Sequence, residues 1–65
     1  MISYTPFYKT LLKKKITKYK LINTYLISPA TLHRMKNNQS ITLATVDELC
    51  KILNCDITDI VRIIN

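Results

Sequence analysis

Hydrophobic residues recur three and four positions apart along almost the whole of the 65-residue chain. This spacing is typical of amphipathic helices that share a core, and a Ser, Thr or Asp in front of such a run marks a helix start. We therefore predict an all-α fold of five short helices. The first covers residues 6–14, after Thr5-Pro6. The next three begin after Thr17, after Ser28-Pro29 and after Thr42, and a short fifth helix begins after Asp56.

The core-facing positions of these helices follow from the same spacing. They are Phe7, Tyr8, Leu11, Leu12, Leu21, Ile22, Tyr25, Leu32, Met35, Leu43, Val46, Leu49, Cys50, Leu53, Ile57, Ile60, Val61 and Ile64. Ile27, just before the third helix, and Leu32 within it have the spacing of a hydrophobic staple. Such a staple predicts a tight corner between the second and third helices.

Helix ends in this chain must be built without glycine, since the sequence contains none. We predict the left-handed backbone at Asn38 and Asn54, because asparagine tolerates that conformation better than other residues with a side chain. Residues 1–4 and 61–64 are rich in β-branched and aromatic side chains. The alternative prediction for these two segments is that they are extended and pair with each other as two short strands.

Basic residues dominate the first forty positions. Residues 1–40 contain eight Lys and Arg and no Asp or Glu, whereas residues 41–65 contain four acidic and two basic side chains. This asymmetry predicts one surface suited to a polyanion such as nucleic acid. Four carboxylates and one His provide no paired acid and base, activated nucleophile or metal-ligand set. We expect neither an enzyme nor a bound metal, cofactor or small molecule.

The two cysteines, Cys50 and Cys55, are five residues apart and match no zinc-binding pattern. Cys50 falls on an apolar helical face and is predicted to be a core residue, and Cys55 to be a loop thiol; a disulfide between them is the alternative. No segment approaches the ~18 apolar residues of a membrane span. The N-terminus lacks the layout of a secretory signal, so we expect a cytoplasmic protein.

The predicted third helix, within residues 28–38, has a distinctive outer face. When Leu32 and Met35 point inward, Ala30, Arg34 and Asn37 lie nearly opposite, and Thr31 and His33 lie on the flanks. Small side chains at its start allow close approach to a surface, and Arg34 reaches beyond them. This shape suits the major groove of double-stranded DNA, where an arginine can bond guanine O6 and N7 and a methyl group can touch thymine.

Residues 17–40, TKYKLINTYLISPATLHRMKNNQS, resemble the helix-turn-helix of the Cro/C1-type (XRE) transcriptional regulators. The positions that match the family pattern are Thr17, Leu21, Ile27, Ser28, Leu32 and Asn37. The segment SYTPFYKTLLKKKIT is similar to the family's first helix, and TLATVDELCKILNCDITDIVRII to its fourth and fifth. The resemblance implies a single lambda-repressor-like domain over residues 1–65, with the helix-turn-helix at about 17–37. Its implied function is sequence-specific DNA binding by a transcriptional regulator, most simply a repressor.

The resemblance also implies which residues meet DNA. The base-facing candidates are Pro29, Ala30, Thr31, His33, Arg34 and Asn37, and the phosphate-facing candidates are Lys18, Ser28, Lys36, Asn38 and Gln39. The chain departs from the family pattern in several places: Lys18 replaces Gln, Ile22 replaces Ala, Leu26 replaces the glycine of the turn and Lys36 replaces Glu. Pro29 and Ala30 also stand where many members have polar base-reading side chains, which implies more readout by apolar contact and DNA shape. A left-handed Leu26 would cost about 1–2 kcal/mol.

Regulators of this family usually bind as two-fold dimers on half-sites about one helical turn apart. The candidate dimer surface is Ile60, Ile63 and Ile64, and the alternative is that these residues close a monomeric core. A second function remains open, an antitoxin or phage accessory protein that acts mainly through protein partners. RNA binding is disfavoured because Tyr4, Tyr8, Tyr19 and Tyr25 occupy predicted core or half-buried positions. Membrane binding is disfavoured because the lysines are spread over several helices.

Overall fold

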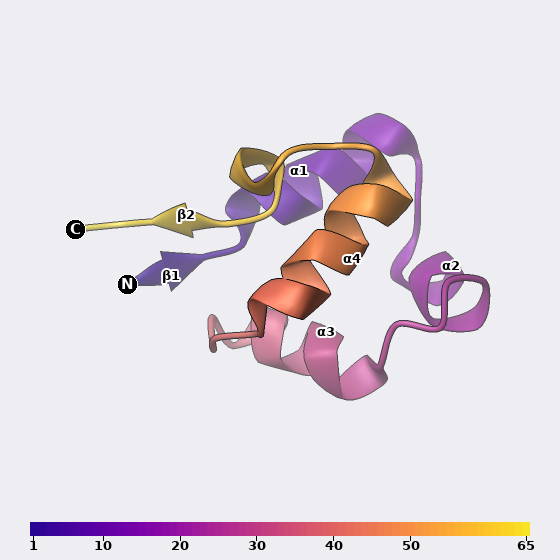
Figure 1. Ribbon diagram of the computed structural model, residues 1–65, viewed down its shortest axis with the longest axis horizontal. Coiled ribbons are helices and arrows are strands. Elements are labelled where there is room, and N and C mark those ends of the chain that lie inside the picture. The colour runs from indigo at the N-terminus through magenta and orange to yellow at the C-terminus, as the bar shows by residue number, and fades with distance from the viewer.

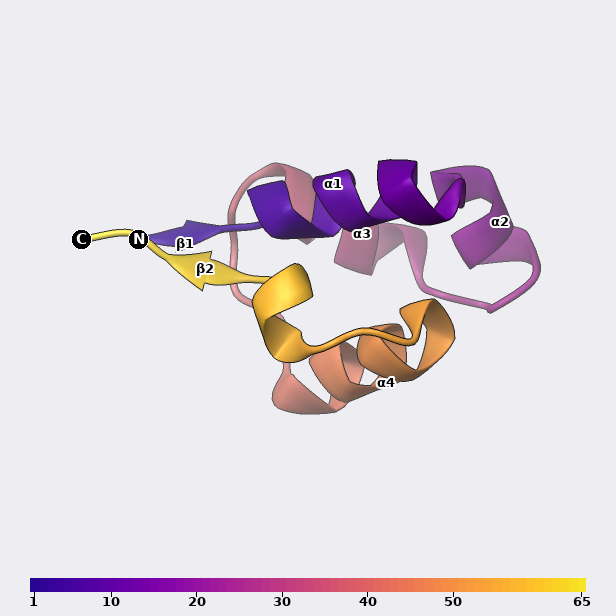
Figure 2. The same cartoon turned by 90° about the horizontal axis from the view of Figure 1, so that it is seen from above.

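Four α-helices form the body of the molecule, in the predicted order (Figure 1). The computed structural model describes residues 1–65. The helices are α1 (Thr5–Lys14), α2 (Lys18–Asn23), α3 (Pro29–Lys36) and α4 (Leu43–Leu53). Seen from above, α1 and α4 lie on opposite sides, α2 lies at one end and the chain termini lie at the other (Figure 2). None of the four helices combines the length and the apolar composition that a membrane-spanning helix requires.

The C-terminal segment differs from the predicted fifth α-helix. It forms a single 3-10 turn, η1 (Ile57–Asp59), which is followed by the strand β2 (Arg62–Ile63). Asp56 and Asp59 close this turn as a reciprocal capping box. The chain then pairs antiparallel with β1 (Ile2–Ser3), with Ile2 opposite Ile63. The alternative prediction of a terminal strand pair is therefore confirmed, and a fifth α-helix is not, because strand pairing takes the residues that would extend it.

Three of the predicted α-helix caps are confirmed, in addition to the predicted cap at Asp56, which opens η1. The hydroxyl of Thr17 accepts the N–H of Lys20 at 3.1 Å, that of Ser28 accepts the N–H of Ala30 at 3.2 Å, and that of Thr42 accepts the N–H of Thr45 at 3.2 Å. The predicted cap at Thr5 is wrong. Helix α1 begins one residue earlier, with Thr5 inside it, and Ser3 Oγ accepts the Thr5 N–H at 3.3 Å.

The C-terminal ends of α1, α3 and α4 share one geometry. In each, a left-handed residue is followed by an N–H that donates to the carbonyl five residues earlier, as in a Schellman motif. The left-handed residues are Lys15, Asn38 and Asn54. The bonds run from Ile16 to Leu11 (3.0 Å), from Gln39 to Arg34 (2.9 Å) and from Cys55 to Cys50 (3.0 Å). The predictions for Asn38 and Asn54 are confirmed, and Lys15 is a third case.

The turn between α2 and α3 places a leucine in the left-handed region. Leu26 has φ 59° and is 81% exposed, so its side chain gains nothing from burial. The strain is about 1–2 kcal/mol. The Ile27 N–H donates to the Leu21 carbonyl at 3.0 Å, and both of these side chains are buried. The corner is therefore held by the residues around Leu26.

The core contains eleven buried apolar side chains. Those without any exposed surface are Phe7, Leu21, Met35, Leu49 and Ile60. Five side chains predicted to be at least half-buried are instead exposed: Leu12, Tyr19, Leu43, Ile57 and Ile64. The predicted sets of core-facing positions were too large, because a short helix buries only the side chains that face its neighbours directly.

Tyr4 joins the start of the chain to the loop between α3 and α4. Its ring is 2% exposed, and its hydroxyl donates to the Gln39 carbonyl at 2.6 Å. Burial raises the pKa of the phenol, so the hydroxyl remains a donor at neutral pH. This bond fixes the chain immediately after α3.

Removing the Tyr4 hydroxyl should destabilise the protein modestly. In Tyr4→Phe the Gln39 carbonyl loses its partner, and we expect the free energy of unfolding to fall by about 0.5–1.5 kcal/mol. Urea denaturation followed by circular dichroism measures this change. Tyr19→Phe is the matched control because Tyr19 is 76% exposed. Equal losses in the two variants would show that the bond to Gln39 contributes nothing specific.

Candidate nucleic-acid interface

The corner formed by α2, the turn and α3 presents one face of α3 to solvent. Ile27 and Leu32, the predicted staple pair, are 4% and 7% exposed, and Met35 is fully buried one turn further on. These side chains attach α3 to the core along its inner face. The opposite face carries none of the buried core residues, so it is free to contact a partner.

The residues predicted to face DNA bases lie on or beside this outer face. Five of them are exposed, namely Pro29, Ala30, His33, Arg34 and Asn37, and Thr31 is half-buried. Pro29 and Ala30 form the first turn of α3, directly after the Ser28 cap. The helix therefore begins with a flat, small-residue surface.

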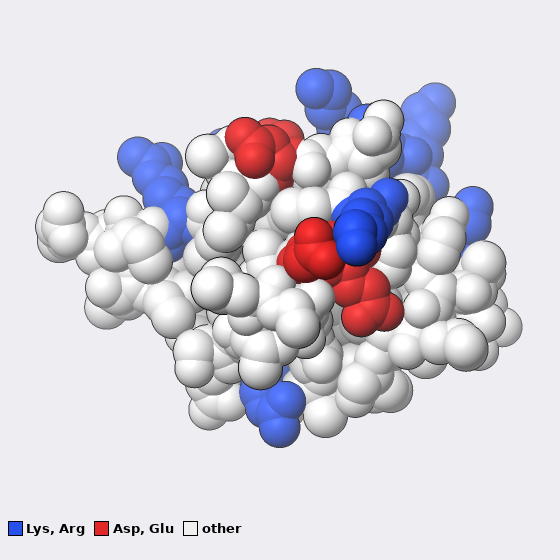
Figure 3. Space-filling model, in the orientation of Figure 1, with Lys and Arg blue, Asp and Glu red and all other residues white.

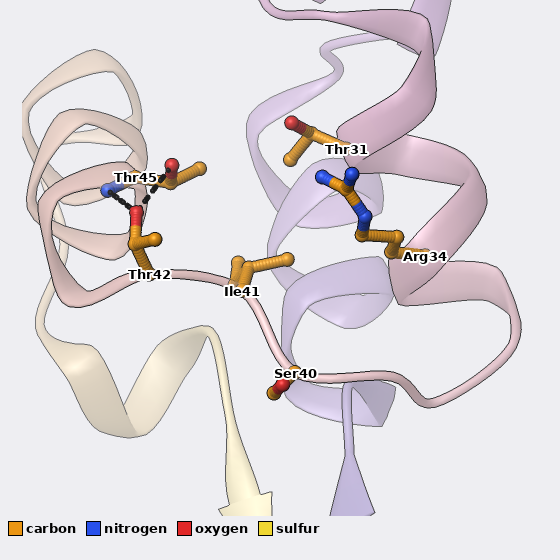
Figure 4. A pocket seen from close by; sticks show the side chains of 6 residues that line it. All are labelled: Thr31, Arg34, Ser40, Ile41, Thr42 and Thr45. Atoms are coloured by element: carbon orange, nitrogen blue, oxygen red, sulfur yellow. Dashed lines mark hydrogen bonds between the residues drawn. The ribbon is translucent and has the colours of Figure 1, made fainter.

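Arg34 lies toward α4 rather than at the middle of the outer face. Figure 4 shows its guanidinium extending from α3 beside Thr31 into a groove that faces α4. The groove has a volume of about 310 Å³, and its other lining residues are Ser40, Ile41, Thr42 and Thr45. The one ion pair of the molecule joins Lys51 and Asp47, at 3.1 Å, so Arg34 is held by no carboxylate.

The hydroxyl groups across this groove were not among the predicted site residues. Ser40 lies in the loop after α3, and Thr42 and Thr45 lie at the start of α4. Thr42 and Thr45 hydrogen-bond each other through their hydroxyls at 2.9 Å, as the dashed line in Figure 4 marks. The polar run that follows Asn37 in the sequence was the available signal, but helical spacing alone does not bring it opposite Arg34.

Asn37 and His33 form a local pair at the end of α3. The Asn37 side-chain amide donates to the His33 carbonyl at 2.9 Å and lies 3.3 Å from the His33 Nε2. Asn37 is also the C-cap residue of the helix. Its amide group is therefore partly committed to the protein, and both side chains remain exposed to solvent.

The residues predicted to face phosphates surround α3. Lys18 opens α2 and holds its ammonium 5.3 Å from the centre of the Tyr8 ring, a cation–π contact that restricts its position. Lys36 is exposed in the last turn of α3. Asn38 and Gln39 follow at the helix end, where the Gln39 backbone is held by Arg34 and Tyr4. Ser28 caps α3 with its hydroxyl.

Charge is segregated between two surfaces. Figure 3 shows carboxylates gathered over α4 and η1, with basic side chains mostly around the edge of that view. The acidic residues are Asp47, Glu48, Asp56 and Asp59, all exposed. The basic residues of α1, α2 and α3 have no acidic neighbour within those helices. A polyanion would therefore be attracted to the side formed by α1, α2 and α3 and repelled by the α4–η1 side.

Comparison with known proteins agrees with this arrangement. Residues 8–65 match the model of the Cro/C1-type helix-turn-helix DNA-binding domain family. The chain belongs to this family and is a DNA-binding domain of the helix-turn-helix class.

A solved structure is similar over most of its length. It is the crystal structure of the transcriptional regulator VanUg, with a TM-score of 0.85 and 28% sequence identity, covering 94% of this chain and 81% of that one. A search of curated proteins finds no significant match.

Proposed function

We propose that the protein is a transcriptional regulator, most simply a repressor, that binds a specific site on double-stranded DNA by inserting α3 into the major groove. The supporting observation is that Leu32 and Met35 hold the inner face of α3 against the core. Arg34 is exposed on the same helix and has no carboxylate partner. Membership in a DNA-binding family and similarity to a transcriptional regulator agree with this role. The whole chain would act as one DNA-binding domain in the cytoplasm.

Sequence would be read by the start and middle of α3. Arg34 would bond guanine, and Thr31 or Ala30 would contact thymine methyl groups. Pro29 would lie at the floor of the groove, with His33 and Asn37 at its margins. Because the first turn offers few hydrogen-bond donors, apolar contact and DNA shape would supply part of the specificity.

Phosphates on either side of the groove would be bound by the surrounding polar residues. These are Lys18, Ser28, Lys36, Asn38 and Gln39. The cation–π contact holds the Lys18 ammonium near α1, and Lys36 lies at the other end of the helix-turn-helix. Contacts of this kind set the register and orientation of α3 but carry no sequence information.

Fluorescence anisotropy tests this function directly. The protein is titrated against DNA from upstream of its own gene and against a scrambled duplex, both near 150 mM salt. Affinity for the upstream DNA should be about 10³-fold higher or more. Equal and steeply salt-dependent binding to both duplexes would contradict sequence-specific regulation and leave only a basic surface.

Lys36→Ala tests the phosphate contacts. We expect weaker binding to every sequence, and a slope of log affinity against log salt that is flatter by about one unit. Lys51→Ala is the matched control, because Lys51 lies on the acidic surface and pairs with Asp47. An unchanged slope for Lys36→Ala, or an equal change in both variants, would remove Lys36 from the phosphate-binding set.

An exposed apolar surface offers a site for a second copy of the chain. We define the terminal apolar surface as Leu43, Ile57, Ile63 and Ile64, which are 76%, 42%, 64% and 46% exposed. The first three of these also line an apolar cavity of about 290 Å³ that extends to Ile2 and Val61. Ile60, the remaining member of the dimer candidate, is fully buried and belongs to the core. The proposed dimer surface therefore includes Ile63 and Ile64 but not Ile60.

Ile63→Lys should separate the two copies. A charge within the terminal apolar surface should raise the dimer dissociation constant by about 30-fold or more. Sedimentation velocity with operator DNA should detect two chains per operator for the wild type and one for Ile63→Lys. The same experiment without DNA measures dimerisation of the free protein. Leu12→Lys is the control, because Leu12 is equally apolar and 81% exposed but lies on α1. Two chains per operator in Ile63→Lys would exclude this surface as the dimer contact.

The same surface supports a second candidate function, an antitoxin or phage accessory protein acting through a protein partner. A neighbouring reading frame that encodes a toxin or an integrase would favour this role. The anisotropy experiment separates the two, since a protein acting mainly through partners would lack the large preference for its own upstream DNA.

A further inference from the structure

The end of α4 brings the two cysteines of the chain together. Asn54 adopts the left-handed conformation, and the Cys55 N–H donates to the Cys50 carbonyl at 3.0 Å. In this motif the side chains on either side of the bond usually make an apolar contact. At the end of α1 the equivalent residues are Leu11 and Ile16, whereas at the end of α4 they are two free thiols.

The two thiols are half-buried and line the same groove. Burial raises the pKa of both thiols, that of Cys55 to about 11, and the nearby carboxylate of Asp59 raises both further. Both line a groove of about 310 Å³ whose other walls are apolar apart from Asp47 and Asp56. Lys14 is close enough to Cys55 to act in the opposite direction and lower its pKa.

Two sulfur atoms select a particular class of metal ion. No group of three or more His, Cys, Asp or Glu side chains could hold a metal in this molecule, which argues against tetrahedral zinc. Thiolates favour soft ions such as Cu(I), and a filled d shell allows such ions to bind two ligands in a line. We propose that Cys50 and Cys55 form a two-coordinate site for a soft monovalent cation, Cu(I) or its redox-inert analogue Ag(I).

Binding of the cation releases the protons of both thiols. Each thiol gives up its proton to solvent and forms one metal–sulfur bond, so a cation with a single charge leaves the site with one negative charge and two protons in solution. Lys14 lies near enough to Cys55 to offset part of that charge, whereas the carboxylates of Asp47, Asp56 and Asp59 oppose it. Because the thiols are protonated at neutral pH, affinity rises as the pH is raised. The metal then joins the end of α4 to the segment leading into η1.

Silver titration tests the proposal on the full chain. Native mass spectrometry should detect one Ag(I) per chain with the loss of two protons, and thermal unfolding of the complex should occur at a higher temperature than that of the metal-free protein. Cys50→Ser and Cys55→Ser should each lose the complex. The double variant is the control for binding by methionine or histidine, and circular dichroism checks that each variant is folded.

X-ray absorption of the Cu(I) form gives a second test that needs no variant. Two sulfur neighbours per copper, with no nitrogen or oxygen neighbour, is the expected result. Retention of the Ag(I) complex in either single variant, a different coordination number, or binding of Zn(II) with equal affinity would overturn the proposal. None of these measurements involves DNA, so the site stands or fails independently of the proposed function.

Discussion

Arg34→Ala is expected to weaken binding to the specific operator by about 1–3 kcal/mol, or about 5–150-fold, and to leave binding to random DNA nearly unchanged. The reason is geometric. Arg34 extends from the exposed side of α3 without a carboxylate partner, and its side chain is long enough to reach beyond Pro29 and Ala30. A bidentate contact to guanine would be lost with the side chain, whereas the other basic groups around α3 would still attract any duplex.

Competition anisotropy against operator and scrambled DNA measures both affinities for each variant. Arg62→Ala is the matched control, since Arg62 is the one other arginine and lies exposed on β2. Replacing the contacted guanine by another base should weaken binding of the wild type by as much as Arg34→Ala does. The same base change should not weaken binding of the Arg34→Ala variant any further. Equal losses on operator and random DNA would instead make Arg34 a phosphate contact, directed toward the groove with Thr42 and Thr45.

Leu11→Ala is expected to lower the free energy of unfolding by about 2–5 kcal/mol. Leu11 is 6% exposed and packs in the core with Phe7, Leu49 and Ile60. A domain of this length has a total stability of about 3–10 kcal/mol. The loss is therefore a large fraction of the total, and denaturation followed by helical circular dichroism should show a strongly lowered unfolding midpoint.

Leu12→Ala provides the matched control on the neighbouring residue of the same helix. Leu12 is 81% exposed, so the same chemical change should alter stability by less than about 0.5 kcal/mol. The two leucines appear equivalent from their spacing, and only packing distinguishes them. If Leu12→Ala proved as costly as Leu11→Ala, α1 would have to be rotated relative to the structure described above.

Much of the fold could be predicted from local chemistry. Thr17, Ser28 and Thr42 cap helices because their hydroxyls can satisfy N–H groups that have no partner within the helix. Asn38 and Asn54 end helices because they tolerate a left-handed backbone. The terminal strands were only an alternative, since pairing between residues at opposite ends of the chain, such as Ile2 and Ile63, leaves no periodic signal within a two-residue strand.

The candidate site was predicted less completely than the fold. A helical wheel places Arg34 opposite the core, but the wheel describes where a side chain begins and not where it ends. A long, flexible side chain follows the groove between two helices, which depends on the angle at which α4 packs. For the same reason Ser40, Thr42 and Thr45 could not be assigned to the surface facing Arg34 before the structure was known.

The glycine-free turns also have a consequence for the unfolded chain. Lys15, Leu26, Asn38 and Asn54 each hold a side chain where the backbone favours glycine. Each β-carbon adds strain to the folded state, but it also restricts the backbone of the unfolded state, which lowers the conformational entropy lost on folding by about 0.4–1 kcal/mol per position. For the asparagines the two effects nearly balance. Lys15 and Leu26 each gain less than they lose, so the end of α1 and the corner of the helix-turn-helix are the two connections with most room for stabilisation.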